Sequence, residues 1–160
     1  MNQIKTYVTI MQESLERKGR YLSEILELTR KQEQLAKEKK FNEDAFGEII
    51  DKKEVLIHNI NEIDKGFTSV YDRVRTEVLD HQDVYREELL EMQASIRLCV
   101  DLGMQIEALE ERNRKTLSQA FAKGFRGIKQ AKQSKQAASR YYQNMANGMV
   151  NDSMLYDRKK

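Results

Sequence analysis

Two histidines and one cysteine are the side chains of this 160-residue chain best suited to hold a metal or attack a substrate. His58 follows Glu54 by four residues and precedes Glu62 by four, so the three side chains would share one side of a helix. A metal site needs further ligands that converge on one point, and neither His81 nor Cys99 has the spacing of a ligand cluster. We therefore expect a surface histidine with acidic neighbours, no metal and no cofactor.

The sequence gives equally little support for a nucleophilic active site or for a nucleotide-binding site. Cys99 falls on an apolar helical stripe, which predicts a buried thiol rather than an activated thiolate. The stretch AKGFRGIK is superficially similar to nucleotide- or RNA-binding signatures, but those need a P-loop after a strand or aromatic side chains on a sheet. Because the chain contains no convincing strand, this match is weak. With no metal site and no activated nucleophile either, we predict no enzyme, no catalytic residue and no small-molecule substrate.

The end of the chain has the chemistry of a protein-binding face. Tyr141, Met145 and Met149 are spaced four residues apart, with Tyr142 beside the first. Methionine adapts to irregular partners and tyrosine combines apolar area with a polar tip, but this face is too sparse to build its own core. We predict a segment that folds on binding, with the alternative that it folds back onto the rest of the chain. The predicted client-binding residues are Phe121, Phe125, Ile128, Tyr141, Tyr142, Met145, Met149, Leu155 and Tyr156.

Charge is distributed unevenly, although the formal net charge is only +2. Residues 1–111 carry sixteen basic and twenty-four acidic side chains, a net charge of −8, whereas residues 112–151 carry nine basic side chains and no acidic one. Basic groups beside a binding face steer acidic surfaces toward it and act on the association rate more than on affinity. The predicted steering residues are Lys129, Lys132, Lys135 and Arg140.

Composition indicates which elements carry these residues. Apolar residues make up 39% and charged residues 34%, with no proline and no tryptophan, which is typical of long amphipathic helices. No run of eighteen apolar residues is present and the N-terminus lacks an apolar signal core, so we expect no membrane insertion. The single cysteine fits a reducing compartment, and we expect a cytoplasmic protein.

Three long stretches carry apolar residues at alternating spacings of four and three, the pattern of a coiled-coil seam. The first predicts a helix over about residues 2–40, and Lys18, Thr29 and Gln32 interrupt its seam. The second predicts a helix over about 43–79, with Lys53 and Glu77 as the polar members of its seam. Each seam needs another long helix as its partner.

Capping residues indicate where these helices meet. Asn42 is a suitable N-cap, and Phe41 and Phe46 occupy the positions of a hydrophobic staple. The second helix could end at Gly66 or near residue 80, and we favour the later break, with Asp80 as the next N-cap, because it gives two helices of matched length. The third helix is then predicted over about 81–128.

The predicted fold is therefore all-α: an elongated antiparallel three-helix bundle or coiled coil. Its body covers residues 1–120. Residues 121–160 form a basic, tyrosine- and methionine-containing extension that is helical or flexible and binds the client.

Three stretches of the chain resemble the FlgN-type flagellar export chaperones. They are FNEDAFGEIIDKKEVLIHNI, IEALEERNRKTL and the closing YYQNMANGMVNDSMLYDRKK, which together extend over most of the chain. Many members carry an asparagine at the position of Glu110. The resemblance implies a small cytosolic chaperone that binds hook-filament junction (hook-associated) proteins before secretion, covers their terminal amphipathic helices with its C-terminal part, and docks on the flagellar export apparatus.

Two other classes remain open. A structural coiled-coil adaptor would pair its seams between chains and form an obligate oligomer, whereas the chaperone is expected to be a monomer or a weak dimer. A nucleic-acid binder would use the nine basic residues of the tail and would lose affinity steeply with salt, but the acidic body repels phosphates. We favour the chaperone.

Overall fold

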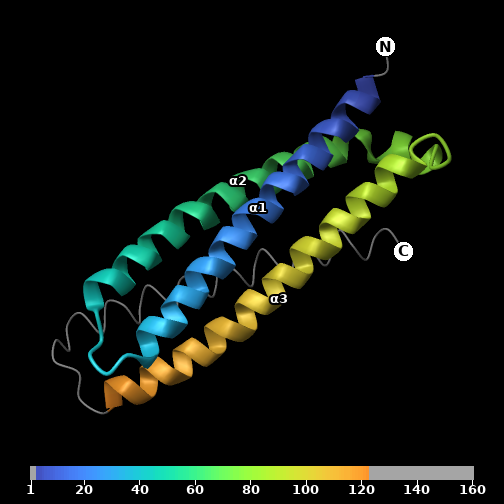
Figure 1. Cartoon of the computed structure of the whole chain (residues 1–160). Helices are drawn as coiled ribbons and strands as arrows, with labels where there is room; N and C mark the ends of the chain where they lie inside the picture. The colour runs from blue at the N-terminus through green and yellow to red at the C-terminus, as the bar shows by residue number, and fades with distance from the viewer. Residues whose placement is uncertain (1–2, 123–160) are drawn as a thin grey trace.

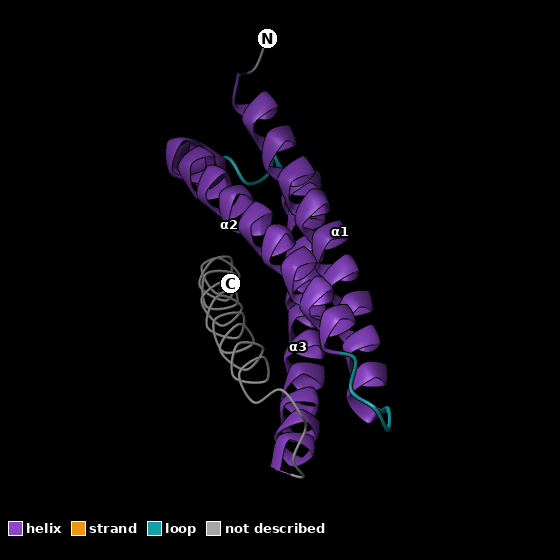
Figure 2. Cartoon of the chain, turned by 90° about the vertical axis from the view of Figure 1, so that its left-hand side faces the viewer, coloured by secondary structure: helices purple, strands orange, loops and turns teal. Residues whose placement is uncertain are grey.

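The computed structural model describes residues 3–122, which form three helices joined by two short connections (Figure 1). Helix α1 spans Gln3–Lys37, α2 spans Glu43–Asp80 and α3 spans Arg86–Ala122. Among these residues Figure 2 shows helices and connecting loops and no strand. Since an α-helix rises 1.5 Å per residue, the 38 residues of α2 extend over about 57 Å. The predicted elongated all-α three-helix bundle is confirmed for this part of the chain.

Helix α1 is the central helix of the bundle, because it packs against both α2 and α3 (Figure 1). α2 runs antiparallel to α1, and α3 returns parallel to it. Buried residues from all three helices form three clusters that follow one another along the rod. The three predicted seams therefore bury one another within a single chain.

Most of the polar residues that interrupt the seams lie in this core. Lys18, Thr29, Gln32 and Lys53 are 0 to 4% exposed, so the heptad register continues through them. Glu77 differs, because its side chain is about half exposed. Buried polar groups need hydrogen-bond partners, and those partners are described below.

The start of α2 is built as the sequence predicts. The Asn42 side chain accepts a hydrogen bond from the backbone N–H of Ala45 at 3.1 Å, and the Phe41 and Phe46 rings pack with centroids 5.3 Å apart. The helix then continues through Gly66. Both the N-cap with its staple and the continuous second helix are confirmed.

The start of α3 corrects the prediction. Asp80 is the last residue of α2 rather than an N-cap, and α3 begins at Arg86, five residues after the predicted start at 81. The His81 backbone N–H donates to the Glu77 carbonyl at 3.1 Å and ends α2, and a turn follows. That turn places Tyr85 in the core, where it is 4% exposed. Burial of this aromatic ring outweighs the local capping preference of Asp80, which was the basis of the predicted start.

The predicted C-terminal ends of the first and third helices differ in how far the structure describes them. α1 ends at Lys37, three residues before the predicted end near 40. α3 runs to Ala122, the last described residue, so its predicted end near 128 lies outside the described residues.

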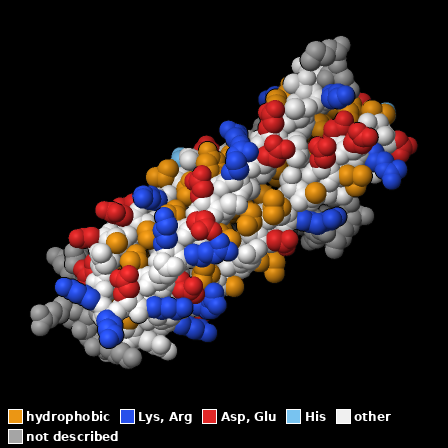
Figure 3. All heavy atoms as spheres, in the orientation of Figure 1, with side chains coloured by type: hydrophobic (Ala, Val, Ile, Leu, Met, Phe, Trp, Pro, Cys, Tyr) orange, Lys and Arg blue, Asp and Glu red, His pale blue; other side chains and the backbone are white. Residues whose placement is uncertain are grey.

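The surface of the rod carries charges of both signs on the face seen in Figure 3, with hydrophobic side chains visible between them. This is the pattern of amphipathic helices whose apolar faces point inward. No helix within residues 3–122 is long and apolar enough to cross a membrane.

Candidate functional site

Phe121 is the one predicted client-binding residue within the described part of the chain. It is half-buried in the last turn of α3, and its ring meets Phe41 edge-on with centroids 6.0 Å apart. Outside the described residues lie the predicted client contacts Phe125, Ile128, Tyr141, Tyr142, Met145, Met149, Leu155 and Tyr156 and the predicted steering residues Lys129, Lys132, Lys135 and Arg140.

The surroundings of Phe121 define where the C-terminal segment begins. Phe121 and Phe41 belong to a cluster at one end of the rod, formed with Ala36, Phe46, Ile50 and Leu117. This cluster packs the last turn of α3 beside the connection between α1 and α2. Residues 123–160 therefore start from this end of the bundle. Phe121 contributes to the body, and its contact with a client stays a prediction.

A buried polar cluster lies close to the same end and joins all three helices. Its members are Thr29 and Gln32 on α1, Lys53 on α2, and Glu110 and Asn113 on α3, each 4% exposed or less. Lys53 Nζ donates to Gln32 Oε1 and forms an ion pair with Glu110. The Thr29 hydroxyl lies 3.1 Å from Glu110 Oε1, and Asn113 Nδ2 donates to the Thr29 carbonyl at 3.1 Å. Because the partners come from different helices, these bonds fix the register of the bundle.

Burial dominates the titration of Lys53 in this cluster. It lowers the pKa of Lys53 from its ordinary 10.5 to about 8, although the charge of Glu110 and its hydrogen bond act in the opposite direction. A lysine with this pKa has the proton affinity of a general base, but a base must reach its substrate. Lys53 is 2% exposed, and the groove described below does not include it. We assign the cluster to structure rather than to catalysis.

A second charged contact stabilises the pairing of α1 with α2. Lys18 is 2% exposed, and its Nζ lies 2.9 Å from Asp64 Oδ1. Like Lys53, it occupies a seam position where an apolar residue would be expected. Both lysines of the seams thus reach across the core to a carboxylate.

The residues considered first for chemistry lie apart from one another. His58 is exposed on α2, whereas Cys99 is 2% exposed and its Sγ lies 3.7 Å from the Leu15 carbonyl. Burial of the thiol agrees with its seam position. Within residues 3–122, no three His, Cys, Asp or Glu side chains are grouped so that they could hold a metal.

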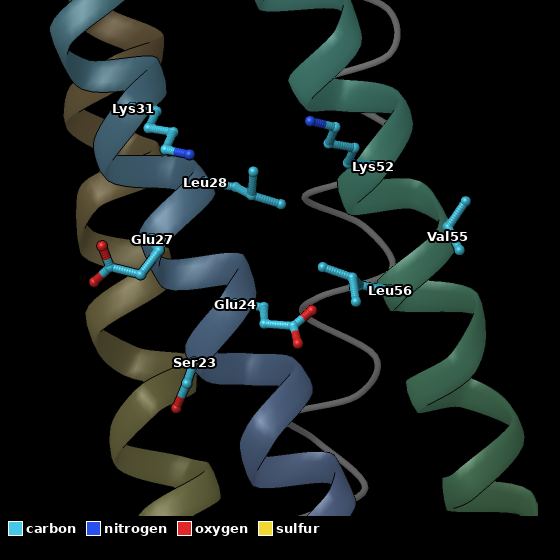
Figure 4. A pocket seen from close by; sticks show the side chains of 8 residues that line it. All are labelled: Ser23, Glu24, Glu27, Leu28, Lys31, Lys52, Val55 and Leu56. Carbon is cyan, nitrogen blue, oxygen red and sulfur yellow. The ribbon is translucent and has the colours of Figure 1, made fainter.

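An open groove of about 620 Å³ lies between α1 and α2. Leu28 and Leu56 point into it from the two helices, and Val55 at its edge is 61% exposed (Figure 4). Lys31 and Lys52 lie together at one end of the groove (Figure 4). The remaining lining residues are Ser23, Glu24 and Glu27.

The groove lies outside the predicted seams, although the sequence carries a signal for it. Tyr21, Leu28 and Leu35 are spaced seven residues apart on α1, and all three are half-buried. This is a second stripe beside the main seam, and a search limited to the seam positions passes over it. A partly buried heptad stripe predicts an additional helix contact.

Comparison of the chain with protein-family models, with curated proteins and with solved structures gives no match.

Proposed function

We propose that this protein is a nonenzymatic chaperone that binds an amphipathic helix of a client protein through residues 121–160. In this proposal the three-helix rod is the carrier, and the tyrosine- and methionine-containing face of the C-terminal segment covers the client helix. The residues resembling FlgN-type chaperones narrow the proposal to a cytoplasmic flagellar export chaperone for hook-filament junction proteins.

The packing of the seams is the observation that supports the proposal. Each of the three helices buries its seam against the other helices of the same chain. The body therefore needs no partner chain to complete its core, and a distinct segment with protein-binding chemistry follows it in the sequence. An obligate coiled-coil adaptor would need those same seam residues for its partner, so the packing argues against that class.

The distribution of charge argues against nucleic acid as the main partner. Residues 1–111, which hold most of the rod, carry a net charge of −8, and phosphates would be repelled along its length. The basic residues of 112–151 would instead attract the acidic surfaces of a protein client.

The first experiment asks which proteins the segment captures. The full chain and a chain stopped after residue 122 are used as baits in an extract of the source organism, and captured proteins are identified by mass spectrometry. We expect a hook-filament junction protein with the full chain and none with the shortened one. Equal capture by both chains would remove the segment from the mechanism, and capture of only unrelated proteins would remove the flagellar assignment.

The second experiment tests the binding face with point variants and purified client. Tyr141→Ala combined with Met145→Ala should weaken binding by about tenfold or more if the two residues are central contacts of the interface, since truncation of such hot-spot residues costs over about 1 kcal/mol each. The matched control, Gln133→Ala with Gln136→Ala, changes polar residues of the same segment and should alter affinity by less than about twofold. If both pairs weaken binding equally, the tyrosine and methionine face is not the contact. Salt titration of the same complex identifies nucleic-acid-like binding by a steep loss of affinity.

A further inference from the structure

The groove between α1 and α2 is an apolar surface bordered by opposite charges. Leu28 and Leu56 form its floor, and the two lysines, Lys31 and Lys52, lie at one end (Figure 4). Glu24 lies on α1 on the far side of Leu28 from the lysines. The groove is therefore positive toward one end and negative toward the other.

The apolar character of this face extends beyond the groove. On α1, half-buried Tyr21 and Leu35 lie one heptad to either side of Leu28. On α2, Leu56 and Val70 are half-buried, whereas Ile49 and Ile63, at the same seven-residue spacing, are buried in the core. Two adjacent antiparallel helices thus share a partly exposed apolar face, and another antiparallel helix pair can pack on such a face to form a four-helix arrangement.

The charges that line the groove of one copy are complementary to those of a second copy in the opposite orientation. Leu28 lies three residues from Lys31 and four residues from Glu24 on the same helix. A two-fold axis beside Leu28 therefore places Lys31 of one copy opposite Glu24 of the other, and the same contact occurs twice. Lys52, which lies at the same end as Lys31, adds to the positive side of each contact.

We propose that this face, centred on Leu28 and Leu56, is a reversible dimer interface between two copies of the chain that are related by a two-fold axis with antiparallel rods. The apolar side chains that line the groove are only Leu28, Val55 and Leu56, so the contact buries little apolar surface and the dimer is weak. A dissociation constant on the order of tens of micromolar corresponds to such a contact. This dimer leaves the main seams inside each chain and differs from an obligate coiled coil.

Charge-reversal variants of the full chain test the interface. We compare wild type, Glu24→Lys, and Lys31→Glu combined with Lys52→Glu, by sedimentation equilibrium over about 5 to 500 µM. All three positions are exposed, so the variants should keep the unfolding midpoint of the wild type within a few degrees. Each variant alone should dimerise at least about tenfold more weakly than wild type, because like charges then face each other. An equimolar mixture of the two should restore a dimer within a few-fold of wild-type strength.

The matched control is Glu107→Lys, which reverses an exposed charge on α3 and should leave dimerisation unchanged. A wild type that stays monomeric to about 500 µM overturns the proposal, as does a mixture that dimerises no better than its components. Dimerisation only after removal of residues 123–160 also overturns it, because the chain's own segment would then occupy the face. These measurements use the purified protein alone, so their outcome is independent of whether a client binds.

Discussion

Lys53 and Glu110 place two charges in the centre of a core that is otherwise largely apolar. Removing two charges from water costs several kcal/mol per ion, and the ion pair with its hydrogen bonds to neighbouring helices recovers part of that cost. Such a pair is a weak source of stability. Its value lies in register, because α2 can satisfy the ammonium only when Gln32 and Glu110 are level with it.

Breaking this pair from one side should be costly. Glu110→Gln removes the carboxylate and leaves the Lys53 ammonium buried without its counter-charge. We expect the free energy of unfolding to fall by about 3 to 5 kcal/mol. Urea unfolding followed by circular dichroism measures the change, and the exposed Glu107→Gln on the same helix serves as control, with an expected change below about 0.5 kcal/mol.

Replacing both partners should behave differently from replacing one. Lys53→Met combined with Glu110→Leu exchanges the pair for apolar side chains of similar size, and we expect a stability within about 1 kcal/mol of wild type or above it. A double variant as unstable as Glu110→Gln alone would show that the apolar side chains do not fill the site and that lost packing dominates.

The pH dependence of stability reports the same lysine. Because burial lowers the pKa of Lys53 to about 8, the folded chain releases this proton above that pH, whereas the unfolded chain holds it up to 10.5. The unfolded state binds more protons in this window, so the free energy of unfolding rises with pH. We expect a gain of about 1.5 kcal/mol between about pH 8 and pH 9.5, relative to the double variant, which lacks both titratable groups. If the free energy of unfolding changes with pH in the same way for the wild type and the double variant, Lys53 has its ordinary pKa in the folded state.

The sequence reveals three of the five members of this cluster and, in the same way, Lys18 of the separate contact with Asp64. Lys18, Thr29, Gln32 and Lys53 are recognisable as polar interruptions of regular seams, so their seam positions follow from periodicity alone. The identity of their partners does not follow from periodicity. The pairing of Lys53 with Glu110 depends on the axial offset of α2 against α3, and no local sequence pattern sets that offset. Long-range register is fixed by the whole core rather than by either helix.

At the scale of the elements, local chemistry predicts the helices where caps and seams agree. Asn42 with its staple marks the start of α2 correctly, because the cap uses atoms only a few residues apart. The start of α3 is misjudged because burial of Tyr85, a tertiary contact, overrides the capping preference of Asp80. The α1–α2 groove is missed for a different reason. The seven-residue spacing of Tyr21, Leu28 and Leu35 is visible in the sequence beside the main seam, but the partial burial that marks it as a contact face appears only when the two helices lie side by side.

Gly66 tests the continuity of α2. A methyl group added at this position meets nothing within 4 Å, and the residue is exposed inside a continuous helix. Gly66→Ala should therefore raise the free energy of unfolding by about 1 kcal/mol, because alanine loses less backbone entropy on folding. Gly66→Pro should lower it by about 3 kcal/mol or more, since proline removes a backbone hydrogen bond and clashes with the preceding turn. Tolerance of proline with no gain from alanine would indicate a break of α2 at this residue.

At the scale of the whole molecule, the bundle is asymmetric in its packing. α1 contacts both neighbouring helices, whereas the contacts of α2 and α3 are made chiefly with α1. If α2 or α3 detached, the other outer helix would stay packed on α1. If α1 detached, both outer helices would lose their main packing partner. In the sequence, residues 123–160 follow the last described turn of α3, which is one of the two outer helices.

This asymmetry predicts the order of hydrogen exchange. Amides in the middle of α1, around Leu22 and Ile25, should open only on global unfolding, because both faces of the helix are packed. Amides in the middle of α2 and α3 can also open when a single outer helix detaches, so they should exchange faster by about tenfold or more. Hydrogen–deuterium exchange with mass spectrometry resolves the three helices as separate peptides. If α1 exchanges as fast as the outer helices at all times, the rod unfolds as one cooperative unit, and a client or second copy that binds it would protect all three helices equally.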